Sequence, residues 1–289
     1  MSGALWALVA AVGFAFGQVS NRKVNQVVDA YRTAFGLVLA VEIILLARIL
    51  VLGDLDVLLS APPEAILIFG LTTLFHFVGS WTLLALSQQR IGVARTGALV
   101  AAAPVVGTLM AAIFLDEPLT IAIAGGVLLA VVGVSLISLS GAVPGSDERR
   151  SPWLALTVAL IWGSTPLLIR LGLEQYDHPV EGLTLGMASS VVVYAAILTA
   201  TRRWRGAVSG TALRWMAIGG FFSAVAVSAQ WLSFDLTTIA IAITIQQFSV
   251  IFVIALVPIM FRQPFERMNP RFFGGVVLVL TGATIVLLS

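Results

Sequence analysis

The chain has 289 residues, of which 59% are hydrophobic and only 10% are charged. Soluble domains carry roughly 25% charged residues, so this composition excludes a water-exposed globule, and the mean hydropathy of +1.04 agrees. The absence of cysteine excludes disulfides, thiolate metal sites and cysteine nucleophiles, and the net charge of +2 is too small and too scattered for a nucleic-acid-binding patch.

Ten apolar segments follow one another along the chain. A helix that crosses a bilayer needs about 20 apolar residues, and cutting the sequence at charges, prolines and glycines leaves runs of that length. We therefore expect an all-α integral membrane protein rather than a barrel, which would show alternating segments of about 10 residues. The first run is followed, not preceded, by positive charge, so we interpret it as a span and not as a signal peptide. The predicted helices cover residues 3–21, 31–52, 64–87, 92–115, 120–140, 152–172, 181–201, 211–235, 238–261 and 271–288.

The two halves of the sequence repeat each other. Residues 125–140 are identical to residues 274–289 at seven of sixteen positions. Because each half holds five spans, the second copy must cross the membrane in the opposite sense, and such inverted repeats are typical of transporters with a substrate site at the repeat interface. We expect a first repeat at 1–140, a linker at 141–151 and a second repeat at 152–289. The other matches are Phe16-Gly17 with Trp162-Gly163 and Pro118 with Pro264, both 146 residues apart, and Trp81 with Trp231, 150 apart.

Several short phrases, in order, resemble one known family. They are Tyr31-Arg32, Ile91-Gly-Val-Ala94 leading to Pro104, Phe114-Leu-Asp-Glu-Pro-Leu-Thr120, Leu160-Ile-Trp-Gly-Ser-Thr165 and the two glycine-rich terminal spans. Together they resemble the EamA-type exporters of the drug/metabolite transporter superfamily. The resemblance implies a ten-span secondary transporter that exports a small organic metabolite, such as an amino acid, by alternating access.

The sequence departs from that family in three places. Phe16-Gly17 stands where the family usually has Trp-Gly, and the second half has no equivalent of Pro104. It also has Arg262-Gln-Pro264 where the first half has Asp116-Glu-Pro118. These departures affect what the resemblance implies about the substrate, and they do not affect the predicted fold.

Polar side chains inside the spans are the candidates for substrate binding, because they are costly in lipid. Gln230 and Trp231 lie on adjoining faces of the eighth span, where an aromatic surface beside an amide suits an amphipathic organic solute. The resemblance selects spans one, three, four, six, eight and nine as the walls of a central cavity. The predicted binding residues are Gln18, His76, Trp81, Arg95, Thr96, Trp162, Ser164, Thr165, Gln230, Trp231, Gln246 and Gln247.

Structural alternatives stay open for several of these residues. Trp81 and Trp231 could fill space between helices, His76 could be a hydrogen-bonded core residue, and Arg95 could anchor the helix at the interface. A metal site is not expected, because His178, the other histidine, is in a loop.

Glu42 is the acid that lies deepest in a predicted span. An ionised carboxylate at that depth costs at least ~2.5 kcal/mol, so we expect it to be neutral or paired. It is the candidate for carrying a proton that drives export, unless the second span packs at the periphery.

Two other functions compete with transport. An intramembrane enzyme would need a nucleophile with a base, paired acids or a metal cluster, and an accessory subunit would not need polar residues in mid-span. No Gly-x-x-x-x-Gly-Lys loop for ATP is present. We expect no catalysis and no cofactor, a monomer in a bacterial inner membrane, and a small solute, lipid and protons as partners.

Loop charge predicts the orientation. Lys and Arg favour the cytosolic side, and 14 of the 16 lie nearest to odd-numbered connections between spans, which would place both termini outside. Ten-span relatives usually place both termini inside, so the two arguments conflict. The even-numbered connections hold only Arg48 and Arg170; the odd-numbered ones hold Arg22, Lys23, Arg32, Arg90, Arg95, Arg149, Arg150, Arg202, Arg203, Arg205, Arg214, Arg262, Arg267 and Arg271.

Overall fold

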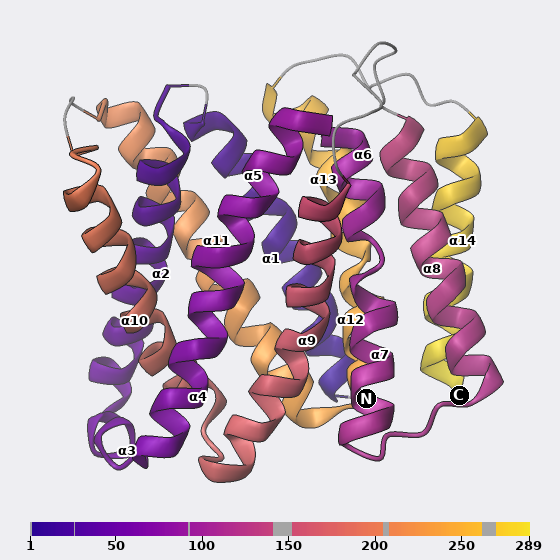
Figure 1. Cartoon of the computed structure of the whole chain (residues 1–289), viewed down its shortest axis with the longest axis horizontal. Coiled ribbons are helices and arrows are strands. Elements are labelled where there is room, and N and C mark those ends of the chain that lie inside the picture. Colours follow the sequence, from indigo (N-terminus) through magenta and orange to yellow (C-terminus); the bar gives the residue numbers. More distant parts are fainter. Residues whose placement is uncertain (1, 26, 92, 141–151, 205–207, 262–269) are drawn as a thin grey trace.

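Helices make up nearly all of the chain, in the order that the apolar runs predict (Figure 1). The computed structural model describes residues 2–25, 27–91, 93–140, 152–204, 208–261 and 270–289. The first half contains α1 (Ser2–Val24), α2 (Ala30–Leu52), the short α3 (Leu55–Leu59), α4 (Pro63–Thr73), the π-helix η1 (Leu74–Gly79), α5 (Ser80–Ile91), α6 (Val93–Val100), α7 (Ala103–Phe114) and α8 (Ile121–Ser140). The second half contains α9 (Trp153–Gln175), α10 (Pro179–Ala200), α11 (Gly210–Leu236), α12 (Ile239–Gln246), α13 (Phe248–Phe261) and α14 (Pro270–Leu288).

These helices form ten membrane-crossing segments. Within the described ranges, nine helical runs are long and apolar enough to span a bilayer, and α12 with α13 forms the tenth. The all-α membrane fold is therefore confirmed, and α1 to α14 match the ten predicted spans to within a few residues. The predicted linker 141–151 lies outside the described residues, and the division into domains at that linker stays a prediction.

Polar caps set several helix ends. The carboxylate of Asp29 accepts hydrogen bonds from the backbone N–H groups of Tyr31 and Arg32, and the Thr238 hydroxyl accepts one from Ile241 at the start of α12. Gly53 ends α2 with φ of 80°, in the left-handed region that favours glycine, and its N–H donates to the Ile49 carbonyl.

Equivalent helices of the two halves run in opposite directions. In Figure 1 both termini lie at the same end of the bundle; α1 and α8 start from that end, whereas α9 and α14 start from the other. The odd-numbered connections therefore lie opposite the termini, and the even-numbered ones, with α3, lie on the terminal side. This is the arrangement that five spans per half require.

The last helices of the two halves meet through the glycines that reveal the sequence repeat. A Cβ atom on Gly133 would lie 2.6 Å from the carbonyl oxygen of Gly275, and a Cβ atom on Gly275 would lie 2.6 Å from that of Gly133. Gly126 and Gly282 approach each other in the same reciprocal way. Small residues permit such close backbone approach in membranes, and α8 and α14 form one edge of the bundle (Figure 1).

Three spans are irregular near their middles. The fourth span breaks at Ala101-Ala102, just before Pro104, as expected for a proline that removes a ladder hydrogen bond. The ninth span breaks at Gln247 without any proline, and there the Gln247 N–H donates to Thr244 O (3.2 Å), three residues back. The third span contains the π-helical turn of η1, a feature that is frequent at functional sites.

Candidate functional site

The first polar cluster joins the third and sixth spans. The π-helical turn of η1 carries His76, whose Nδ1 lies 3.1 Å from Thr165 Oγ1 on α9. The imidazole stacks on the Trp162 indole with ring centroids 5.8 Å apart and an interplanar angle of 23°. Trp162 Nε1 donates to Ser80 Oγ (2.6 Å), and the Ser80 hydroxyl donates to the carbonyl oxygen of His76. Four polar groups thus hold one another at a single depth in the bundle.

The second polar cluster joins the eighth span to the break in the ninth. Gln230 Nε2 donates to Gln246 Oε1 over 2.8 Å. The amide nitrogens of Gln246 and Gln247 are buried, and neither has a hydrogen-bond partner in the described part of the chain. Gln246 is only 9% exposed, so leaving its amide N–H groups without a partner costs about 1–3 kcal/mol of stability each. A ligand or a water molecule that accepts these hydrogen bonds would remove that cost.

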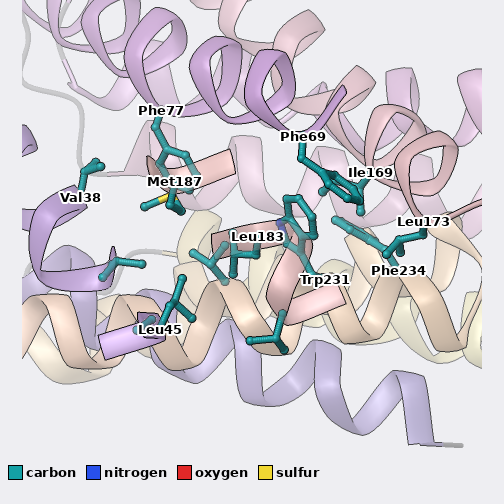
Figure 2. Packing of buried hydrophobic residues seen from close by; sticks show 14 of the residues in the cluster. Val38, Leu45, Phe69, Phe77, Ile169, Leu173, Leu183, Met187, Trp231 and Phe234 are labelled. Atoms are coloured by element: carbon teal, nitrogen blue, oxygen red, sulfur yellow. The ribbon is translucent and has the colours of Figure 1, made fainter. Parts of the chain in front are cut away.

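The two tryptophans of the expected aromatic wall differ in their surroundings. Trp231 is 2% exposed and packs against Phe69, with ring centroids 5.2 Å apart, in the core shown in Figure 2. Trp81 is half-buried and lies 5.7 Å from the Phe77 ring. Phe69 itself sits against Gly172 and Gly182, where no Cβ atom would fit.

The other predicted residues lie apart from these clusters. Thr96 is buried and shares a hydrogen bond with Ser87 (2.9 Å), and Ser164 donates to Ile161 O in its own helix. Gln18 is exposed on α1. The side chain of Arg95 lies outside the described residues.

Glu42 lies on α2, which packs against α10 and α11 at one side of the bundle (Figure 1). Its side chain is buried, with 6% of the residue exposed. Its Oε2 atom has no hydrogen-bond partner among the residues described. The carboxyl group is therefore enclosed. The sequence could not show whether this span lies at the center or at the periphery of the bundle.

Sequence reasoning missed a charged cavity on the terminal side. The cavity has a volume of about 460 Å³. Arg170 Nη1 donates to Asp235 O (3.2 Å) and Nη2 donates to Thr237 O (3.3 Å), and Glu117 accepts from the Ile239 N–H at the start of α12 (2.9 Å). The signal was present as four acids and one arginine at span ends, but the loop-charge argument used only the arginine, and a count along the sequence does not show that the five converge. The lining residues are Phe114, Leu115, Asp116, Glu117, Arg170, Leu173, Glu174 and Asp235.

The described residues offer no metal-binding cluster, since no group of three or more His, Asp or Glu side chains comes together among them. The chemistry that the two central clusters can provide is hydrogen bonding and aromatic contact with a solute.

Comparison with known proteins gives the family of the first half. Residues 1–139 match the model of the EamA-like transporter family. The chain is EamA-like over its first half. The resemblance to drug/metabolite transporters is thus confirmed over residues 1–139, which match a family of membrane transporters.

Solved structures extend the similarity to the second half. A structure titled only "Crystal structure of protein" is similar with a TM-score of 0.77 over 99% of this chain and 95% of its own, at 15% sequence identity. At that identity the likeness shows the fold alone. In all, 27 chains of solved structures match, whereas no curated protein matches the sequence.

Proposed function

We propose that the chain is a secondary transporter that exports a small organic solute, such as an amino acid, by alternating access between its two halves. The observation that carries this proposal is the pair of helix breaks in spans four and nine. They occupy corresponding places in the two halves, and the second one presents the free amide groups of Gln246 and Gln247. Discontinuous helices at a repeat interface are where transporters of this kind bind substrate.

Flux through the purified protein in liposomes tests this function. We expect saturable uptake of at least one member of a panel of labelled amino acids, and at least a tenfold loss in Gln246→Leu. Thr284→Val is the matched control, because Thr284 is exposed on α14 and bonds only to its own helix at Leu280 O. Uptake no greater than that of empty liposomes, or an unaffected Gln246→Leu variant, contradicts the proposal.

Proton coupling is assigned to Glu42. The carboxyl group is enclosed and has an oxygen without a partner in the described chain, and a buried acid of this kind can exist neutral and bind or release one proton. We expect Glu42→Gln to abolish the dependence of flux on a pH gradient while solute exchange without a gradient continues. A variant that still responds to the gradient removes Glu42 from the mechanism.

The proposed orientation has both termini outside the cell and the odd-numbered connections in the cytosol of a bacterium. It is supported by the 14 basic residues at those connections. The terminal side instead holds nine of the fourteen acids. Alkaline phosphatase fused after Ser289 should be active, whereas a fluorescent green protein in that place should be dark; the opposite pair of results reverses the orientation.

A further inference from the structure

The stacked rings of His76 and Trp162, which join the two halves, have an apolar twin at a second interface between the halves. Phe16 on α1 and Phe222 on α11 stack with centroids 4.5 Å apart and an interplanar angle of 17°. Both rings are 146 residues from their counterparts, since Phe16 corresponds to Trp162 and Phe222 to His76. The two stacks therefore follow the spacing of 146 and not the spacing of 150 that separates Trp81 from Trp231. The repeat therefore builds the same aromatic contact twice.

The polar partners of the first cluster are all missing from the twin. At the same spacing of 146 residues, Ser80 corresponds to Ala226 and Thr165 to Val19. Two phenylalanines, an alanine and a valine thus fulfil the packing role where the first cluster has a histidine, a tryptophan, a serine and a threonine. Packing alone therefore does not explain the imidazole, whose ring nitrogens can form hydrogen bonds.

The hydrogen bonds around His76 determine which nitrogen of its ring carries the hydrogen. The Thr165 hydroxyl has one proton, and it donates that proton to Ile161 O over 2.8 Å. Its oxygen can then only accept from His76 Nδ1, which lies 3.1 Å away. Nδ1 consequently carries the hydrogen, and in a neutral imidazole Nε2 is left as a bare acceptor.

Nothing in the described chain donates to that acceptor. No hydrogen bond to Nε2 is formed by the described residues, and His76 as a whole is half-buried rather than fully enclosed. The nearest donors are already used, since Trp162 Nε1 bonds to Ser80 and Ser80 bonds to the His76 carbonyl. Tyr194 is the titratable group that reaches η1 from α10, and its hydroxyl donates to Phe77 O (3.0 Å).

We propose that His76 Nε2 accepts a hydrogen bond from the ammonium group of the transported solute, against the face of the Trp162 ring. This inference rests on the transport function proposed above and names the class of solute: a primary amine. A charged donor makes a hydrogen bond roughly twice as strong as a neutral one, and tryptophan is the aromatic ring that attracts cations best. The free amide N–H groups of Gln246 and Gln247 offer the complementary chemistry for a carboxylate, as an amino acid would require.

The tautomer and the binding of amines can be measured without transport. The sequence has two histidines, so protein with ¹⁵N-labelled histidine shows two imidazoles, and His76→Phe assigns them. We expect His76 to carry its hydrogen on Nδ1, and we expect leucine and isoamylamine, but not isocaproate, to shift the Nε2 resonance. A hydrogen on Nε2, no shift with either amine, or an equal shift with isocaproate overturns the proposal.

Transport then tests the same group in the working protein. His76→Phe copies the apolar twin and should keep the stack and the fold, while its preference for leucine over isocaproate should fall at least tenfold. Thr165→Val removes only the partner of Nδ1, so the preference should fall less. A His76→Phe variant that is folded and keeps the preference contradicts the role of His76. If the wild-type protein moves no amino acid but isoamylamine still shifts Nε2, the proposed amino-acid export fails and the amine site stands.

Discussion

The two aromatic stacks show how one backbone arrangement serves two purposes. At the interface of α1 and α11, Phe16 and Phe222 stack, and Val19 and Ala226 hold the positions that correspond to Thr165 and Ser80. At the interface of the third and sixth spans, the corresponding positions hold a connected set of hydrogen bonds. The difference teaches that the repeat builds the same geometry at two interfaces between the halves, whereas four side chains give hydrogen-bonding chemistry to only one of these interfaces.

Gly17 follows Phe16 and Gly163 follows Trp162. Replacing these two glycines with alanine should have different effects on stability. A Cβ on Gly163 would lie 2.5 Å from Val106 Cβ and 2.7 Å from the carbonyl oxygen of Ala103, whereas a Cβ on Gly17 would meet the Ser223 hydroxyl, which can rotate away. We expect Gly163→Ala to lower the free energy of unfolding by about 3 kcal/mol, because a backbone atom cannot yield. Gly17→Ala is the matched control and should cost clearly less. Unfolding in SDS measures both, and equal losses would show that the two interfaces are equally tight.

Placing a histidine in the apolar stack tests whether the polar partners are needed. Phe222→His puts a polar ring in a stack where Val19 holds the position of Thr165, and valine cannot accept a hydrogen bond. We expect a loss of about 2 kcal/mol in the free energy of unfolding, the cost of a buried group without a partner. Adding Val19→Thr supplies the missing acceptor and should recover part of the loss. If the double variant is no more stable than Phe222→His, the threonine is not what allows a histidine in the stack with Trp162.

The smallest expected change in stability comes from removing the indole nitrogen of Trp162. Trp162→Phe makes the polar stack resemble Phe16 and removes the donor to Ser80, which should cost about 1 kcal/mol for one hydrogen bond. Thermal unfolding monitored by circular dichroism measures it. Adding Ser80→Ala to this variant should cost less than Ser80→Ala does in the wild-type protein, because the bond is already gone. Strictly additive losses would mean that the two side chains do not cooperate.

The ten spans could be predicted because apolar runs of membrane length leave few alternatives. The break before Pro104 could also be predicted, since proline has no backbone N–H and always removes one hydrogen bond from the helix. The break at Gln247 and the π-helical turn at His76 were not, because neither has a local residue that forces it. Both depend on how the halves fit together.

Among the site residues, the sequence could name His76, Trp162 and Thr165 as polar groups in spans, but not their mutual contacts. Those contacts join residues that are 82 and 89 positions apart. The charged cavity around Arg170 was missed for a related reason. Loop charges were used to find the orientation, and only the fold shows that several of them converge.

Each half places its first helix against the other half, and this has a consequence for synthesis on the ribosome. Gly13 of α1 lies against Ala226 of α11, and Gly126 and Gly133 of α8 lie against α14. While only the first five spans have been inserted, these grooves have no occupant from their own chain. A product that stops near residue 139 therefore has open seams that lipid or a second nascent copy must fill. Premature termination in the linker should accordingly yield a short-lived protein rather than a half-sized transporter.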